Sequence, residues 1–477
     1  IIKVNNHIPF YLAFSPLLIL IILLASNVYI YGDNSLSGPN QIALLLSTSI
    51  AVLISIYYGS KWKNILNAIS NSISSTSSAI IILLLIGALT GTWLISGIVP
   101  AMIFYGLKIL NPEIFLFASC IICAIVSIAS GSSWSTIATI GIALIGIGEA
   151  LGISQGLVAG SIISGAYFGD KMSPLSDTTN LAAAMAGTDL FVHIKYMMYT
   201  TIPSFLITLL IFFFIGIYSD ISTDQNIDTL LSAVENKFNI NLWLFLVPLT
   251  VVIMIIKKTP AIPALLAGTI LGGIFAIIFQ PQIILEISES NNLSFISCYK
   301  GIINAMASDI SISSDNTLIN NLLNSSGMKG MLSTIWLVIC AMSFGGAMQE
   351  GGLLKRISDP IMSYANNPGS LITTTSATCI FFNLTTSDQY LSIVVPGRMF
   401  EKNYKDKGLA PENLSRTLED SGTVTSVLIP WNTCGAAQSA VLGVATLSYL
   451  PYCFFNLISP LMTILYGYLK IKIKKIS

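Results

Sequence analysis

The fold is decided by one polar stretch inside an otherwise apolar region: Tyr167-Phe168-Gly169-Asp170-Lys171-Met172-Ser173-Pro174-Leu175-Ser176-Asp177-Thr178-Thr179-Asn180. A membrane helix is expected to continue here, yet the stretch carries two carboxylates, one ammonium group and a proline. Pro174 removes a backbone donor and clashes with the preceding turn, so a regular helix cannot pass through it. In lipid, the freed backbone groups must be buried in protein or line a wet cavity. A broken helix with charges at membrane depth therefore predicts a substrate site.

The composition places the whole chain in a membrane. Of its 477 residues, 54% are hydrophobic and 9% are charged, and the mean hydropathy is +0.79. These values are typical of a polytopic membrane protein. Basic and acidic residues balance at 22 each, so no basic patch indicates a nucleic-acid partner. The seven cysteines lie mostly inside apolar segments and are interpreted as free buried thiols.

Ten apolar segments approach the roughly 17–25 residues needed to cross a bilayer, and the one at 242–256 is short. They lie near 8–31, 40–58, 79–98, 154–180, 195–218, 242–256, 261–279, 331–350, 411–432 and 446–469.

Two further apolar regions, 113–150 and 370–400, are interrupted by the polar clusters 130–134 and 385–389. Each region could be two crossing helices or one re-entrant hairpin. We favour hairpins, because the arms of 370–400 have about 15 residues or fewer, short of a crossing. The predicted fold class is an all-α polytopic membrane protein with about ten transmembrane helices, two re-entrant hairpins and two broken helices, 154–180 and 411–432.

Lysine and arginine predict the orientation. With the N-terminus in the cytoplasm, seventeen of them fall inside, four fall outside, and Lys171 lies within the membrane. Cytoplasmic loops are enriched in Lys and Arg, so both termini are expected in the cytoplasm of a cell-membrane protein. The acidic stretch 219–241 and the loop 280–330 are then expected outside.

The second half of the chain repeats the first faintly, and the polar cluster 130–134 corresponds to 385–389. The matches in order are Gly91–Gly97 with Gly346–Gly352, Asn111-Pro112 with Asn367-Pro368, Cys120 with Cys379, Asp170 with Asp420, Ser173 with Ser426, and Leu175 with Leu428. Each half has an odd number of crossings, so the second half is inverted. One transporter domain is thus expected, with repeats 1–218 and 242–477 joined by the extracytoplasmic linker 219–241.

Inverted symmetry brings the two hairpin tips and the two helix breaks together at the midplane. Their side chains are mostly oxygen donors, which hard cations prefer. A buried carboxylate can hold either a proton or a metal ion, so the carboxylates are the candidate Na⁺ and H⁺ ligands. The candidate residues are Asp170, Asp177, Asp388, Asp420, Ser132, Ser133, Ser173, Thr178, Asn180, Asn383, Thr423 and Asn432.

Several of these residues also fit structural roles. Hydroxyl groups in membrane helices often bond to backbone carbonyls, and Asp388 could cap a half-helix. Lys171 is a charge partner for Asp170 or Asp177, either as a structural neutraliser or as the carrier of a coupled proton. Glu419 lies three residues after Arg416 and could pair with it.

Enzymatic chemistry has little support. The histidines are His7 and His193, and His193 fits an interfacial or capping role better than a ligand role. No zinc-ligand spacing, phosphate loop or nucleophile elbow is found, so neither enzymatic activity nor a cofactor is expected.

The polar motifs resemble those of the NhaC-type sodium/proton antiporters, within the larger ion-transporter group of inverted-repeat carriers. The motifs are Gly131-Ser132-Ser133-Trp134, Phe168 through Asn180, Asp388 through Ser392, Pro396 through Phe400, Leu414 through Thr423, and Pro430 through Gly435. The resemblance spans roughly residues 75–455. Its pattern at the second break usually reads Ser-Pro-Leu, where this chain has Ser426-Val427-Leu428.

The resemblance implies a secondary transporter with Na⁺ and H⁺ as substrates, surrounded by membrane lipid. A homodimer is compatible with this interpretation. Because the family also contains exchangers that couple sodium or protons to small organic acids, exchange of a malate- or lactate-like acid stays open as the alternative. Lys171, Arg398 or Arg416 could then hold the carboxylate.

Overall fold

The helices follow the apolar segments of the sequence closely. The computed structural model describes residues 8–31, 35, 38–109, 111–218, 227–257, 259–313, 320, 323–362 and 367–476. The helices of the N-terminal part are α1 Phe10–Tyr31, α2 Pro39–Tyr57, α3 Trp62–Ser75, α4 Ser77–Ile95, α5 Ile98–Ile109, α6 Pro112–Ser130, α7 Ser133–Thr136, the π-helical η2 Ile137–Gly141, α8 Ile142–Ala150, α9 Gln155–Met172, α10 Asp177–Ala186 and α11 Leu190–Tyr218.

The remaining elements begin in the stretch predicted as a linker. They are α12 Ile227–Lys237, the 3₁₀ helix η3 Leu242–Phe245, α13 Leu246–Ile256, α14 Ala261–Phe279, α15 Pro281–Ser288, α16 Phe295–Ala307, β1 Ile310–Ser311, β2 Asn324–Ser325, α18 Gly327–Gly330, α19 Leu332–Glu350, α20 Leu353–Met362, α21 Pro368–Thr386, α22 Leu391–Asp406, α23 Pro411–Leu418, the π-helical η4 Glu419–Thr423, the 3₁₀ helix η5 Ser426–Leu428, α24 Thr433–Leu442, α25 Thr446–Tyr449, the 3₁₀ helix η6 Leu450–Tyr452 and α26 Phe454–Tyr468.

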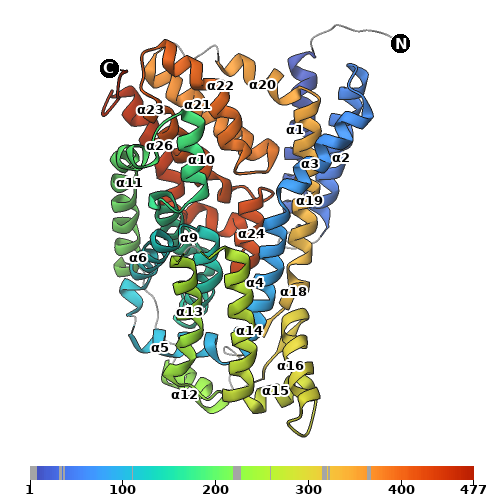
Figure 1. The fold of residues 1–477 in the computed structure, drawn as a ribbon, viewed down its shortest axis with the longest axis vertical. Coiled ribbons are helices and arrows are strands. Elements are labelled where there is room, and N and C mark those ends of the chain that lie inside the picture. Colours follow the sequence, from blue (N-terminus) through green and yellow to red (C-terminus); the bar gives the residue numbers. More distant parts are fainter. Residues whose placement is uncertain are drawn as a thin grey trace.

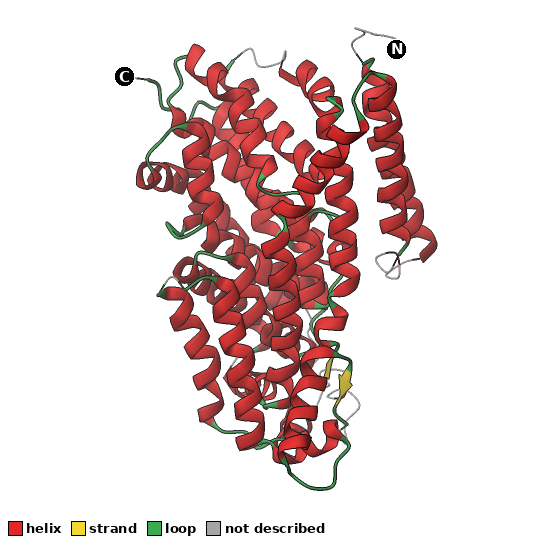
Figure 2. Cartoon of the chain, turned by 45° about the vertical axis from the view of Figure 1, so that its right-hand side comes forward, coloured by secondary structure: helices red, strands yellow, loops and turns green. Residues whose placement is uncertain are grey.

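The protein is an all-α polytopic membrane protein. Eight helices in the described ranges are long and apolar enough to cross a membrane, or ten if two bent pairs each count as one span. The strands resolved in these ranges are β1 and β2, which form a short antiparallel pair with Ile310 opposite Ser325 (Figure 2). The helix count agrees with the expectation of about ten transmembrane helices.

The same series of elements occurs twice along the chain. The paired helices α6 and α21, α9 and α23, and α10 and α24 begin at positions that are 256 residues apart in each case. Both α6 and α21 begin with an asparagine N-cap followed by proline, which starts a helix without losing a backbone hydrogen bond. This order supports the division into two repeats, which stays a proposal.

The register of these helices corrects one detail of the sequence comparison. It places Asp170 opposite Ser426 and Pro174 opposite Pro430, whereas the sequence comparison had paired Asp170 with Asp420, Ser173 with Ser426 and Leu175 with Leu428. The comparison slipped because it aligned two similar aspartates across a stretch that contains a π-helical turn in the second half alone. Pro430 therefore occupies the place of the proline that seemed to be missing from the second break.

The outer helices of each half pack on the other half. In Figure 1, α2 and α3 lie beside α19 at the upper end and α1 lies beside α2 and α20, whereas α14 and α16 lie beside α4. The paired elements α5 and α20 lie at opposite ends of the molecule (Figure 1), as inversion requires. The start of α1 and the end of α26 lie toward the same end (Figure 1).

The two predicted hairpins have longer arms than expected. In the first, Pro112–Ser130 and Ser133–Ala150 have 19 and 18 residues, and each is apolar enough to cross by itself. In the second, α21 has 19 residues and α22 has 16, whereas the sequence indicated about 15 or fewer. Arm length therefore does not favour re-entrant hairpins over crossing helices, and the re-entrant interpretation stays a prediction.

The stretch predicted as a linker between the two halves contains a helix that packs on the core. Helix α12 lies within it and is bent by 85° against the segment that contains η3 and α13. Leu230, Val234 and Phe238 bury one face of this region against the main hydrophobic core. The remainder of the predicted linker, 219–226, falls outside the described residues.

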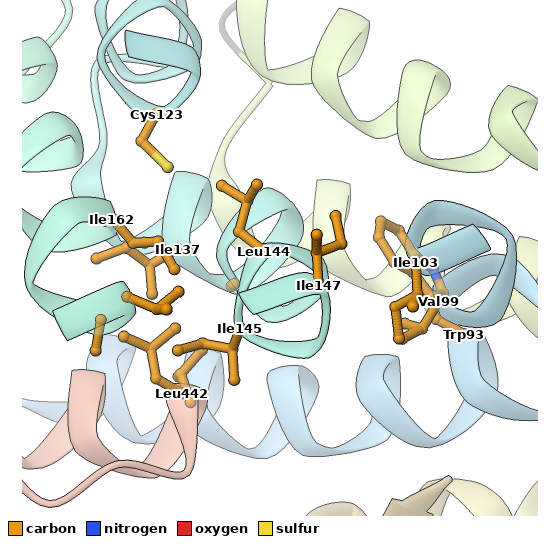
Figure 3. Close-up of a cluster of buried hydrophobic side chains, with 14 of the residues drawn as sticks. Trp93, Val99, Ile103, Cys123, Ile137, Leu144, Ile145, Ile147, Ile162 and Leu442 are labelled. Atoms are coloured by element: carbon orange, nitrogen blue, oxygen red, sulfur yellow. The ribbon is translucent and has the colours of Figure 1, made fainter. Parts of the chain in front are cut away.

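The largest apolar core lies between α4, α5, α8 and α9. Figure 3 shows Ile145, Ile162 and Leu442 gathered from α8, α9 and α24 around the π-helical turn η2. Gly141 lies in that turn, and a Cβ there would lie 3.3 Å from Leu442 and 3.1 Å from Ile162, so the helices approach closely. This core fixes the first hairpin and both broken helices relative to one another.

Candidate functional site

The first hairpin tip lies directly on the first helix break. Gly131 adopts a left-handed backbone (φ 68°), and a Cβ there would lie 2.5 Å from the Cβ of Leu175, so glycine is required for this contact. The contact brings Ser133 to Asp170, whose Oδ2 accepts hydrogen bonds from the Ser133 backbone N–H (3.0 Å) and from its Oγ (2.7 Å). Asp170 is 6% exposed, and its Oδ1 has no partner among the described residues.

The other polar residues of this break satisfy its own backbone. Helix α9 ends at Met172, and Ser173 is extended before Pro174, as the residue preceding a proline prefers. Ser173 Oγ accepts the Leu175 N–H (3.2 Å), and Asn180 donates across the break to the carbonyl of Pro174 (3.0 Å). Ser173 and Asn180, both candidate ligands, therefore stabilise the backbone on either side of the break. In the first tip, Ser132 has a similar role, because its Oγ accepts the N–H of Ser135 (3.2 Å).

Asp177 connects the first break with the second tip. It is the first residue of α10, is exposed, and accepts a hydrogen bond from Tyr390 Oη at 2.5 Å. The next residue, Thr178, is buried with its Oγ1 3.1 Å from Ser176 Oγ. Asp170 and Asp177 therefore differ in environment, because Asp170 is enclosed whereas Asp177 lies at the edge of the site.

The second tip and the second break are also hydrogen-bonded together. Asn432 donates to the Asn383 side-chain oxygen (3.1 Å), and Asn383 donates to the carbonyl of Gly422 (2.7 Å). Asn432 also caps α24 by accepting the Cys434 N–H (3.0 Å). Asp388 is 4% exposed and accepts the Leu391 N–H (2.8 Å) at the start of α22, which is the capping role considered from the sequence.

The two breaks are joined by a buried ion pair. Lys171 Nζ pairs with Asp420 Oδ1, and both side chains are fully buried. Ser459 of α26 also donates to Oδ1 (3.1 Å), and Thr200 of α11 donates to Oδ2 (2.8 Å). Lys171 therefore pairs with Asp420 and not with Asp170 or Asp177, because its helix turns this side chain toward the π-helical turn of the second half.

Glu419 adds a carboxylate beside Asp420. It is fully buried, its Oε1 accepts only the Thr423 hydroxyl (2.8 Å), and its Oε2 has no partner among the described residues. The considered pair between Glu419 and Arg416 does not form, since Arg416 lies over the Tyr196 ring at 4.8 Å.

Sequence reasoning missed Thr200 and Ser459 as partners of Asp420. Both lie in long apolar helices, where a single hydroxyl usually bonds to the helix backbone. Thr200 and Ser459 lie on the buried faces of α11 and α26, and a hydroxyl on such a face was the sequence feature that could have indicated a buried partner.

Buried carboxylates outnumber buried basic side chains in the described part of the chain. The buried carboxylates are Asp170, Asp388, Glu412, Glu419 and Asp420, and the buried basic side chains are Lys171, His193 and Arg416. Among these carboxylates, Asp420 pairs with Lys171 and Glu412 pairs with the partly exposed Lys474, so the other three form no ion pair with a described residue. No group of three or more His, Cys, Asp or Glu side chains that could hold a metal ion is found in the described ranges, so the four candidate aspartates do not form one cluster.

A polar cavity of about 490 Å³ lies beside the second break. Its walls include Gln155, Ser333, Pro430 and Ser439, and none of the buried carboxylates lines it. The buried carboxylates therefore lie outside this cavity.

Comparison with known proteins identifies the family. The profile of the Na⁺/H⁺ antiporter family matches residues 165–471. The chain is 39% identical to the Na⁺/H⁺ antiporter NhaC of Alkalihalophilus pseudofirmus, over 91% of each chain. The chain belongs to the Na⁺/H⁺ antiporter family. This result confirms the resemblance to NhaC-type antiporters drawn from the polar motifs.

Related members of this family carry names that differ in substrate. The chain is 37% identical to the malate-2H⁺/Na⁺-lactate antiporter of Bacillus subtilis, over 90% of this chain and 89% of that one. It is 33% identical to the arginine/ornithine antiporter ArcD of Halobacterium salinarum, over 96% of this chain and 91% of that one. Similarity alone therefore indicates an antiporter more firmly than a particular substrate.

Proposed function

We propose that the protein is a secondary transporter, not an enzyme, that exchanges Na⁺ for H⁺ across the cell membrane by alternating access. The surplus of buried carboxylates carries this proposal. A carboxylate without a basic partner is tolerated in a protein interior when it holds a proton or a cation. A group that can hold either one, but not both at full strength, couples the two ions.

Asp170 is the carboxylate best placed to bind Na⁺. One of its oxygens is fixed by two donors from the hairpin tip, which leaves Oδ1 available to a cation. The Ser133 hydroxyl, 2.7 Å from Asp170 Oδ2, is an oxygen ligand of the kind that hard cations prefer. We place Asp388 and Asp420 after Asp170 among the coupling carboxylates, and Asp177 at the entrance to the site.

Alternating access follows from the arrangement in two halves. We propose that residues 1–218 and 242–477 are inverted repeats, whose tips and breaks move against the outer helices α1, α2, α13 and α14. The outer helices of each half pack on the other half, and this leaves both sets of tips and breaks in the middle of the molecule (Figure 1). This arrangement supports the proposal.

Exchange of an organic acid is the second candidate, favoured by the similarity to the malate and lactate antiporter. The three basic residues considered for binding a carboxylate lie elsewhere, however. Lys171 pairs with Asp420, Arg398 is exposed, and Arg416 packs on Tyr196. The surroundings of Asp170 offer oxygen atoms rather than cationic groups, which favours Na⁺ as the substrate.

Everted membrane vesicles that contain a pH-sensitive dye test the two candidates directly. We expect an imposed pH gradient to collapse when Na⁺ is added alone. A response that needs malate or lactate on one side would establish the second candidate instead. Vesicles without the protein supply the background rate.

The orientation is tested with single cysteines in a background where the seven native cysteines are replaced. Asn291→Cys lies in the loop proposed outside, and Lys402→Cys lies on the side proposed to be cytoplasmic; both positions are exposed. An impermeant thiol reagent added to intact cells should label Asn291→Cys and leave Lys402→Cys unlabelled, because the side with more Lys and Arg stays in the cytoplasm. The reverse pattern would invert the proposed orientation.

A further inference from the structure

A continuous row of polar side chains runs between α11 and the helix α23–η4. On α11 the residues are His193, Tyr196 and Thr200, which are three and four positions apart and therefore share one face. All three are buried, with exposed fractions of 8% or less. On the facing helix, Glu412, Arg416 and Asp420 are each four positions apart, so acid, base and acid alternate along one side. We call these residues, with Asn413 and Ser415, the polar seam.

Hydrogen bonds join the two sides of the polar seam at three levels. Tyr196 Oη donates to Asn413 Oδ1 (2.6 Å), the Ser415 hydroxyl lies 2.7 Å from His193 Nδ1, and Thr200 donates to Asp420 Oδ2 (2.8 Å). Asp420, which takes part in the last of these contacts, also forms the buried ion pair with Lys171.

The other end of the polar seam reaches the surface. Glu412 is 4% exposed and pairs with Lys474, whose side chain is 51% exposed. Lys474 belongs to the C-terminal segment, which crosses this end of α23 and pairs with Leu409 and Ala410. The polar seam thus connects the end of the molecule where α1 begins and α26 ends with the buried ion pair.

Unpartnered polar atoms gather along the polar seam. Glu412 Oε2, His193 Nε2, and Arg416 Nε and Nη2 are buried and have no hydrogen-bond partner among the described residues. Buried polar atoms are nearly always bonded, and internal water is the usual partner where protein groups are lacking. Water bound to these atoms would complete a chain of exchangeable protons from Glu412 to Asp420.

His193 is the residue of the polar seam whose two ring nitrogens can carry a proton from one side to the other. Its Nδ1 faces Ser415 and its Nε2 is open, so it can accept a proton at one nitrogen and release one from the other. Arg416 cannot give up its proton, and its charge lies between those of Glu412 and Asp420. The remaining charged groups that face the polar seam are Lys171, Glu419 and Lys474.

We propose that the polar seam is the route by which protons reach the Lys171–Asp420 pair, separate from the Na⁺ position at Asp170, with His193 as its relay. This inference rests on the proposed exchange of Na⁺ for H⁺. It assigns proton delivery and ion binding to different parts of the molecule. The two steps should therefore be separable by mutation.

The test compares two activities of purified protein in liposomes. Na⁺-driven proton movement is followed with a pH dye, and exchange of radioactive Na⁺ for unlabelled Na⁺ is followed at equal pH on both sides, where no net proton movement is needed. We expect His193→Gln to slow proton movement by about tenfold or more and to leave Na⁺/Na⁺ exchange unchanged. Glu412→Gln, at the mouth of the polar seam, should show the same separation. Thr208→Val is the matched control, because Thr208 is buried on α11 and bonds only to a backbone carbonyl.

The outcomes distinguish this inference from the function on which it rests. Wild-type rates of proton movement in both His193→Gln and Glu412→Gln, across the whole pH range, would overturn the polar seam as the route. An equal loss of both activities would also overturn it, since His193 would then have a structural role only. If the unaltered protein moved no protons in response to Na⁺, the proposed function would fail first, and the proton route with it.

Discussion

Asp170→Asn should abolish Na⁺-driven proton movement while the protein stays folded in the membrane. The asparagine oxygen can still accept the two hydrogen bonds from Ser133, so the contact between the hairpin tip and the helix break is kept. The negative charge is lost, and a buried cation without its counter-charge is destabilised by about 3–5 kcal/mol. This corresponds to a loss of more than about 100-fold in Na⁺ affinity.

The measurement is Na⁺-driven proton movement in vesicles, together with the amount of folded protein in the membrane. Asp309→Asn is the control, because Asp309 is exposed, pairs with Lys329, and lies outside the helix breaks and tips. It removes the same charge and should leave transport unchanged. Wild-type exchange in Asp170→Asn would show that the ion binds elsewhere, and the Asp388 and Asp420 variants would then be examined.

The unaltered protein should also show competition between the two ions. A proton on the Na⁺-binding carboxylate removes the charge that holds Na⁺, so a fall in pH lowers the apparent Na⁺ affinity. If one proton competes with one ion, this affinity changes by about tenfold per pH unit and becomes constant once the carboxylate is fully deprotonated.

The breaks and tips could be predicted from local sequence because their causes are local. Pro174 and Pro430 each stand beside polar residues just after a helical segment ends, and the polar clusters at the tips cannot face lipid. The family resemblance rested on the same residues and is confirmed by the comparisons. These features need no knowledge of how distant segments meet.

The pairing of the charged residues could not be predicted in the same way. Lys171 meets Asp420, which is 249 positions away, because of how α9 and the π-helical turn η4 are rotated toward each other. Asp177 is closer to Pro174 than Asp170 is, yet it is exposed, because the break redirects the chain before α10 begins. Distance from a helix break along the sequence therefore does not decide which carboxylate is enclosed.

Lys171→Met and Asp420→Asn should each destabilise the protein strongly, whereas the double variant should regain most of the lost stability. Each single substitution leaves one fully buried charge without its partner, which costs about 3–5 kcal/mol. In the double variant both charges are gone, and the asparagine oxygen can still accept one of the two hydrogen bonds that Thr200 and Ser459 donate to different oxygens of Asp420. At this chain length, the apparent melting temperature in detergent falls by on the order of 1 °C per kcal/mol.

The double variant also separates the two roles that the sequence left open for Lys171. If the ion pair served only to neutralise charge, the stable double variant would exchange Na⁺ for H⁺ at the normal rate. We expect it to lack Na⁺-driven proton movement, because Asp420 is the inner end of the proposed proton route and an asparagine cannot take up a proton there. Normal proton movement in a stable double variant would assign the pair a structural role. A melting temperature of the double variant no higher than those of the single variants would show that the two side chains do not stabilise each other.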